Sequence, residues 1–134
     1  MQTVSKNLIK RYYGSFNQQD MDAFFSLLDN DVIHDINHGH REVGKDIFLQ
    51  FMQRMNRCYK ETARDLVIMV NEEGTRAAAE FIIEGTYLAT DSGLPEATGQ
   101  RYTIPCGAFF SIRDGKITRV TNYYNLNDWL KQIT

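Results

Sequence analysis

The sequence has no long apolar run and little net charge. None of its 134 residues falls in a stretch that approaches the roughly 18 apolar residues of a membrane span, and the N-terminal segment lacks the uninterrupted apolar core of a secretion signal. Fifteen basic and 17 acidic side chains leave a net charge of −2, which gives no basic field to attract nucleic acid or an anionic membrane. We therefore expect a soluble, cytoplasmic protein with neither nucleic acid nor a membrane as partner.

Cysteines are few, and repeats and linkers are missing. The two cysteines, Cys58 and Cys106, lie far apart and form no CxxC pair, so we predict no disulfide and a reducing compartment. A chain of this length hides roughly two thirds of its unfolded surface on folding, which is enough for one core. We expect a single domain over residues 1–134.

The first half of the chain has three segments with apolar residues at helical spacing. Asp20 precedes the second of them and is a residue type that caps helices. Between the second and third segments, residues 32–38 alternate as a strand does, and Gly39 and Gly44 then bracket a predicted loop. The predicted helices cover residues 4–17, 21–28 and 45–59.

The second half changes to a period of two and predicts an antiparallel meander of four strands, followed by a short helix over residues 126–133. From Ala77 to Tyr87 every other residue is apolar or glycine, as in a strand with one face on the core. Three helices packed on one face of a curved, mainly antiparallel sheet make an α+β fold that can enclose an apolar pocket. The predicted strands cover residues 62–71, 75–89, 100–113 and 116–126.

All three histidines, His34, His38 and His40, lie within seven positions. In a regular strand His34 and His38 share a face but stand about 13 Å apart, too far to bind one metal ion. His38 and His40 could chelate an ion, yet Gly39 indicates a turn between them and no third ligand has a telling spacing. We therefore predict no metal site, and no cofactor.

Three stretches together resemble a known family: RYYGSFNQQDMDAFFSLLDNDVIHD, HREVGKDIF and RDGKITRVTNYYNLNDW. They are similar to the nuclear transport factor 2-like superfamily, and more narrowly to its SnoaL-like, ketosteroid-isomerase-related bacterial members, over nearly the whole chain. The resemblance implies a cone-shaped α+β fold and a homodimer through the outer sheet face, where Phe109 would otherwise be exposed. The superfamily contains isomerases, dehydratases, polyketide cyclases, hydrolases and silent binding modules, so the fold alone does not identify a reaction.

The steroid isomerases of this superfamily use a tyrosine, an aspartate base and a protonated aspartate. The resemblance places the tyrosine on Tyr12. It places the base on Ile36, one residue after Asp35, whose side chain strand alternation directs to the opposite face, and it places the second aspartate near Ala108. Because both carboxylates are missing from their expected positions, steroid isomerisation by this set of residues is not predicted.

Different side chains remain for the predicted pocket. His34 is the candidate base, with Tyr12 as donor to a substrate oxygen and Asp35 as a group that orients a histidine or caps a helix. The alternative for His34 is a strand histidine hydrogen-bonded to a helix end. Candidate substrate-binding side chains are Phe51, Met55, Cys106, Asn122, Tyr124 and His38.

Two functions follow from these candidates. The first is binding of a small, apolar carbonyl or polyketide-like molecule with proton transfer of the isomerase, cyclase or dehydratase type. The second is a non-catalytic ligand-binding or dimerisation module with the same pocket.

Overall fold

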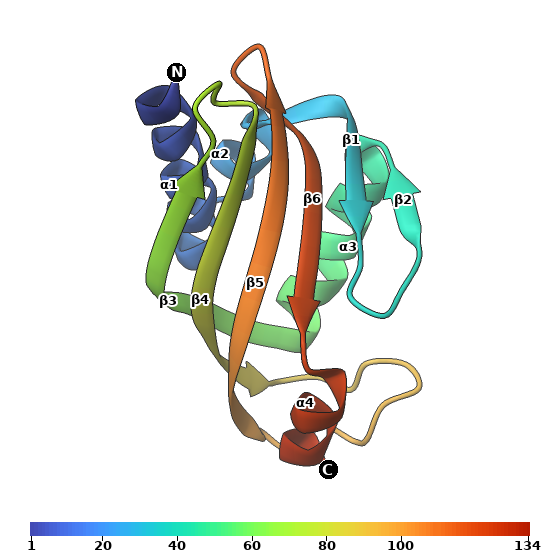
Figure 1. Ribbon diagram of the computed structural model, residues 1–134. Helices are drawn as coiled ribbons and strands as arrows, with labels where there is room; N and C mark the ends of the chain where they lie inside the picture. The colour runs from blue at the N-terminus through green and yellow to red at the C-terminus, as the bar shows by residue number, and fades with distance from the viewer.

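Two helices, α1 (Gln2–Gln18) and α2 (Met21–Ser26), open the computed structural model, which describes residues 1–134 (Figure 1). The buried residues of α1 recur at helical spacing and include Leu8 and Tyr12. Asp20 caps α2 by accepting a hydrogen bond from the Ala23 N–H at 3.2 Å, as predicted. The third helix, α3 (Lys45–Cys58), follows two strands, so only two of the three predicted helices precede the sheet.

The first two strands form a short hairpin, where the sequence predicted one strand and a loop. β1 (Leu28–Asp35) pairs antiparallel with β2 (Arg41–Val43). The predicted strand ran on to His38, but that residue has a φ of 56°, in the left-handed region that reverses the chain. The Gly39 N–H closes this turn by donating to the Ile36 carbonyl at 2.9 Å.

The four predicted strands of the second half are confirmed as an antiparallel meander of β3 (Tyr59–Val70), β4 (Arg76–Tyr87), β5 (Arg101–Arg113) and β6 (Lys116–Tyr124). The six strands of the sheet lie in the order β2-β1-β6-β5-β4-β3, and β1 runs parallel to β6. A bulge in β3 at Asp65, where φ is 54°, interrupts the pairing with β4, and the strand bends so that its first residues run toward the end of α3 (Figure 1).

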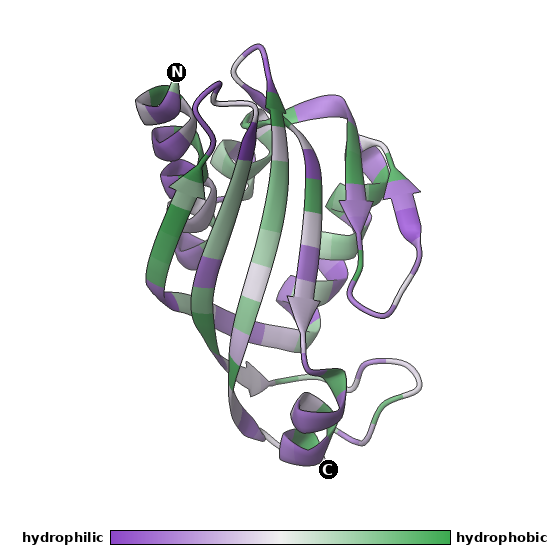
Figure 2. Ribbon diagram, viewed as in Figure 1, coloured by the Kyte–Doolittle hydropathy of each residue, from purple (hydrophilic) through white to green (hydrophobic).

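The core lies between the sheet and the helices that cover one of its faces. Buried and less buried residues alternate along β4 as predicted. Figure 2 shows hydrophobic stretches along the strands that are interrupted by hydrophilic residues. The last helix, α4 (Leu126–Ile133), packs Trp129 and Ile133 into the lower end of the molecule. None of the four helices combines the length and apolar character needed to cross a membrane.

Candidate functional site

A cavity of about 320 Å³ lies among α1, α3, α4 and five of the six strands. Sixteen of its 22 lining residues are hydrophobic, and a mainly apolar cavity with a few polar groups is typical of a small-molecule site. The polar lining residues are His34, Asn37, Arg54, Glu61, Asp91 and Asn122.

His34, on β1, is only 2% exposed and packs against two aromatic rings of α3, those of Phe48 and Phe51. Burial lowers the pKa of its imidazole from 6.5 to about 4, although the nearby charge of Asp35 acts in the opposite direction. The ring is therefore neutral at neutral pH. Its Nδ1 is buried without a hydrogen-bond partner within the chain.

Tyr12 lines the cavity from α1, with its ring between those of Phe24 and Phe110 at centroid distances of 4.6 and 5.3 Å. Burial raises the pKa of its hydroxyl above the ordinary value, so the hydroxyl keeps its proton at neutral pH. This hydroxyl has no hydrogen-bond partner within the chain, whereas the hydroxyls of Tyr59 and Tyr102 are hydrogen-bonded. Tyr12 is thus a donor available to a ligand.

The cavity brings together most of the predicted site residues. Cys106 lies on β5, and burial raises the pKa of its thiol to about 12. A thiol that stays protonated is a poor nucleophile, so Cys106 is a lining group. The predicted residues that line the cavity are His34, Tyr12, Phe51, Met55, Cys106, Asn122 and Tyr124.

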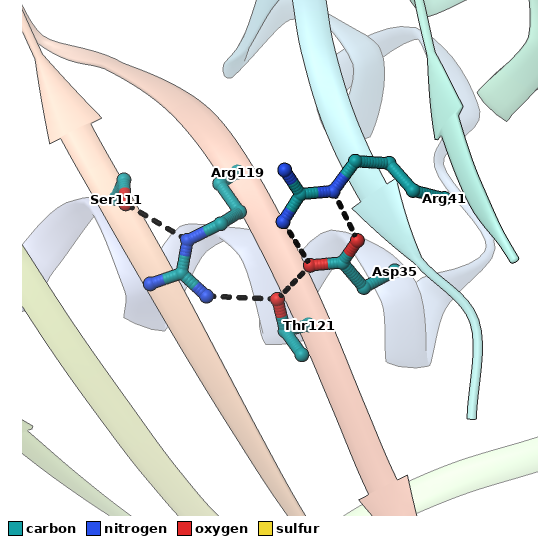
Figure 3. A network of polar contacts seen from close by, with 5 residues as sticks. All are labelled: Asp35, Arg41, Ser111, Arg119 and Thr121. Atoms are coloured by element: carbon teal, nitrogen blue, oxygen red, sulfur yellow. Dashed lines mark hydrogen bonds and ion pairs between the residues drawn. The ribbon is translucent and has the colours of Figure 1, made fainter. Parts of the chain in front are cut away.

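Asp35 does not line the cavity, because strand alternation places it on the face of the sheet opposite His34. Its carboxylate accepts two hydrogen bonds from Arg41, at 2.7 and 3.0 Å, and one from the Thr121 hydroxyl at 2.6 Å (Figure 3). The hydrogen bonds from Arg41 hold the pKa of the Asp35 carboxyl below its usual value. Arg119 extends this network by donating to both Thr121 and Ser111, so the geometry gives Asp35 a structural role on the outer face.

His38 also lies outside the cavity lining. It is exposed in the turn after β1, and the reversal of the chain directs it away from the strand face that it was predicted to share with His34. His40 is exposed as well and stands 3.4 Å from Glu42. No group of three His, Cys, Asp or Glu side chains comes together that could hold a metal ion.

Sequence reasoning missed two acidic residues of the cavity, Glu61 and Asp91. The predicted strand began at residue 62, whereas β3 begins at Tyr59 and its alternation carries Glu61 to the cavity wall. Extending the period of two backwards from Ala63 would have found it. Asp91 is buried in the loop after β4, where it accepts a hydrogen bond from the Tyr59 hydroxyl at 2.8 Å and forms an ion pair with Arg54 at 3.4 Å. No local sequence pattern predicts these contacts.

The sequence profile of the SnoaL-like domain matches residues 9–120. The chain belongs to the SnoaL-like family. Among solved structures, this SnoaL-like chain is similar to a candidate polyketide cyclase from Pseudomonas putida KT2440, with 58% identity over 97% of this chain and 98% of that one and a TM-score of 0.96. A second candidate polyketide cyclase, from Xanthomonas campestris pv. campestris, is 50% identical over 99% and 98% of the two chains, with a TM-score of 0.97.

More distant SnoaL-like and related structures share the fold alone. An LEH-like epoxide hydrolase from M. tuberculosis is 16% identical, over 98% of this chain and 86% of that one, with a TM-score of 0.79. No curated protein matches this sequence. The resemblance to SnoaL-like proteins is confirmed, and the fold is shared with an NTF2-like protein from Burkholderia xenovorans LB400.

Proposed function

We propose that this chain binds a small, largely apolar carbonyl or polyketide-like compound in the cavity and transfers protons on it. The observation that carries the proposal is the neutral imidazole of His34 in the same apolar cavity as the Tyr12 hydroxyl, which has no hydrogen-bond partner within the chain. A neutral imidazole has a nitrogen lone pair that can accept a proton, and a protonated phenol can donate a hydrogen bond.

In the proposed reaction His34 removes a proton from the carbon next to the carbonyl group. Negative charge then develops on the carbonyl oxygen, and the Tyr12 hydroxyl stabilises it by donating a hydrogen bond. Asn122 offers a second polar contact to an oxygen, while the apolar walls exclude water and strengthen these interactions. Isomerisation, cyclisation and dehydration of a carbonyl compound can each begin with this step.

The similar structures from Pseudomonas putida and Xanthomonas campestris support this class of ligand through their description as candidate polyketide cyclases. The competing proposal is a binding protein without turnover. It is favoured by the stacking of His34 on Phe48, which would stabilise a purely packed histidine equally well.

Hydrogen exchange on a probe ketone separates these two functions. The probe is 2-tetralone, an apolar bicyclic ketone whose α-protons exchange with D2O through its enol, and 2-naphthol serves as an enol-shaped ligand for affinity measurements. We expect His34→Gln to slow the exchange about 100-fold with little loss of affinity for 2-naphthol, and His38→Gln, in the exposed turn, to change neither. A wild-type protein that binds 2-naphthol but does not accelerate exchange would be a binding module.

We also propose that the chain forms a homodimer through the outer sheet face. Four large apolar side chains are about half exposed on β3, β5 and β6: Val67, Met69, Phe109 and Tyr123. The strand register places Met69, Ala78 and Phe109 in one row and Val67, Glu80, Gly107 and Tyr123 in the neighbouring row. A contiguous apolar patch of this kind is typical of a protein interface.

The absence of a disulfide between the two free cysteines fits the proposed cytoplasmic location.

A further inference from the structure

Glu61 is a carboxyl group in the cavity wall without a counter-charge. It lies near the start of β3, and it takes part in no ion pair of the structure. The titratable groups close to it are Tyr102 and Cys106 on β5 and Tyr124 on β6, and none of these carries a positive charge. An unpaired carboxylate in apolar surroundings has a high free energy because it has lost its hydration, and binding a proton removes this penalty.

The orientation of Glu61 is fixed by Tyr102, whose hydroxyl donates to Oε2 at 2.5 Å. This contact depends on Gly85, the β4 residue paired with both Glu61 and Tyr102 in the sheet. The Tyr102 ring lies over Gly85 so closely that a Cβ at that position would overlap the ring. With Oε2 occupied as an acceptor, Oε1 is the oxygen left to carry a proton toward a ligand.

Glu61 and Tyr12 line the same cavity, together with Tyr13 and Cys106. Tyr13 is next to Tyr12, with ring centroids 5.1 Å apart, and lies close to Cys106, which in turn is close to Glu61. His34 contributes to the same cavity from β1. A ligand in the cavity is therefore enclosed by a neutral imidazole, a phenol and a carboxyl group.

We propose that Glu61 is a second catalytic residue, a neutral carboxylic acid that gives its proton to the ligand's carbonyl oxygen, and that Tyr102 is its positioning residue. The proposal rests on the proposed function. Burial supports it by raising the pKa of Glu61 while it lowers the pKa of His34, and such opposed shifts are typical of an acid–base pair.

The proton transfers balance. His34 takes the proton from the α-carbon, the electron pair of the broken C–H bond forms the C=C bond of the enol, and the carbonyl oxygen takes the proton of Glu61. This leaves an imidazolium at His34 and a carboxylate at Glu61. The reverse transfers, to the same carbon or to another one, restore both residues without a co-reactant.

The exchange of 2-tetralone protons in D2O tests the role of Glu61. We expect Glu61→Gln, which keeps the shape and an acceptor for Tyr102, to slow the exchange about 100-fold with the affinity for 2-naphthol largely kept. The matched control is Glu84→Gln on β4, because the Glu84 carboxylate pairs with Arg64 and does not line the cavity. The wild-type infrared spectrum at pH 7 should contain a carboxylic-acid band that Glu61→Gln removes.

A pH profile separates positioning by Tyr102 from mere packing. The Tyr102 hydrogen bond favours the charged form of Glu61 and so opposes the effect of burial on its pKa. Tyr102→Phe should therefore raise the pKa of Glu61 and move the alkaline limb of the exchange profile to higher pH, in addition to slowing the exchange. An unmoved limb would overturn the positioning role.

Two outcomes distinguish failure of this inference from failure of the proposed function. Exchange that is lost in His34→Gln but retained in Glu61→Gln would overturn the role of Glu61 and leave the proposed function standing. A wild-type protein without exchange would overturn both. A folded Glu61→Gln protein with an unchanged infrared spectrum would refute the neutral acid directly.

Discussion

The imidazole of His34 lies flat on the ring of Phe48, with ring centroids 4.1 Å apart and an angle of 2° between their planes. Phe51 meets the imidazole edge-on at 4.7 Å. The two phenylalanines remove the imidazole from water, which is the reason for its low pKa and for its neutral state at the pH of the cell.

The low pKa of His34 predicts a loss of stability in acid. The unfolded chain binds a proton at His34 near pH 6.5, whereas the folded protein binds it only near pH 4, so stability is fully present above pH 6.5 and falls as the pH drops between these values. The full shift corresponds to about 3 kcal/mol in the free energy of unfolding. Urea unfolding of the wild type and of His34→Gln between pH 7 and 4 measures it, and parallel stability curves for the two proteins would contradict the prediction.

Asp35 should contribute to stability and not to ligand binding. Asp35→Asn loses the charge-assisted contacts with Arg41 and weakens the hydrogen bond from Thr121. We therefore expect the free energy of unfolding to fall by about 1 kcal/mol, with an unchanged affinity for 2-naphthol. Because its pKa is lowered on folding, the contribution of Asp35 is present above its ordinary pKa of 3.8 and disappears as the pH falls below that value. A reduced affinity for 2-naphthol would contradict the structural role.

The close approach at Gly85 predicts a sharp difference between two glycines of the sheet. Gly85→Ala forces the Tyr102 ring away and should destabilise the protein by about 1–3 kcal/mol, with a loss of exchange activity. Gly107→Ala on β5 is the control, because its nearest neighbour would be the Ala79 carbonyl oxygen at 3.9 Å, an ordinary contact. Thermal unfolding and the exchange assay compare them, and equal effects of the two substitutions would contradict the packing of Tyr102.

The proposed dimer depends on the apolar patch around Phe109. Phe109→Glu places a charge in the row that also contains Met69 and should convert a dimer into a monomer in sedimentation equilibrium. Val4→Glu adds the same charge at a 59% exposed position of α1 and should leave the dimer intact. A wild-type protein that sediments as a monomer would contradict the proposal.

The sequence predicts those parts of the fold that depend on local periodicity. The alternation from Ala77 to Tyr87 identified β4 and its buried face, and the family resemblance together with strand alternation placed Tyr12 and His34 in one cavity. The end of β1 was harder to predict, because Ile36 to His38 continue the alternation although the chain already turns there.

Long-range contacts were beyond sequence reasoning. The hydroxyl of Tyr102 meets Glu61, 41 positions earlier in the chain, and Tyr59 meets Asp91 across 32 positions. Whether a carboxyl group such as Glu61 is solvated or enclosed depends on the bend of β3 at Asp65, which brings the start of the strand to the cavity.

A crystal structure of the protein with 2-naphthol at neutral pH tests the central claim, that the cavity is a ligand site served by His34 and Tyr12. We predict that the naphthol rings lie among the apolar lining residues, with the hydroxyl oxygen within hydrogen-bond distance of Tyr12. A cavity closed by Met52 and Met55, or naphthol bound only elsewhere on the protein, would contradict it.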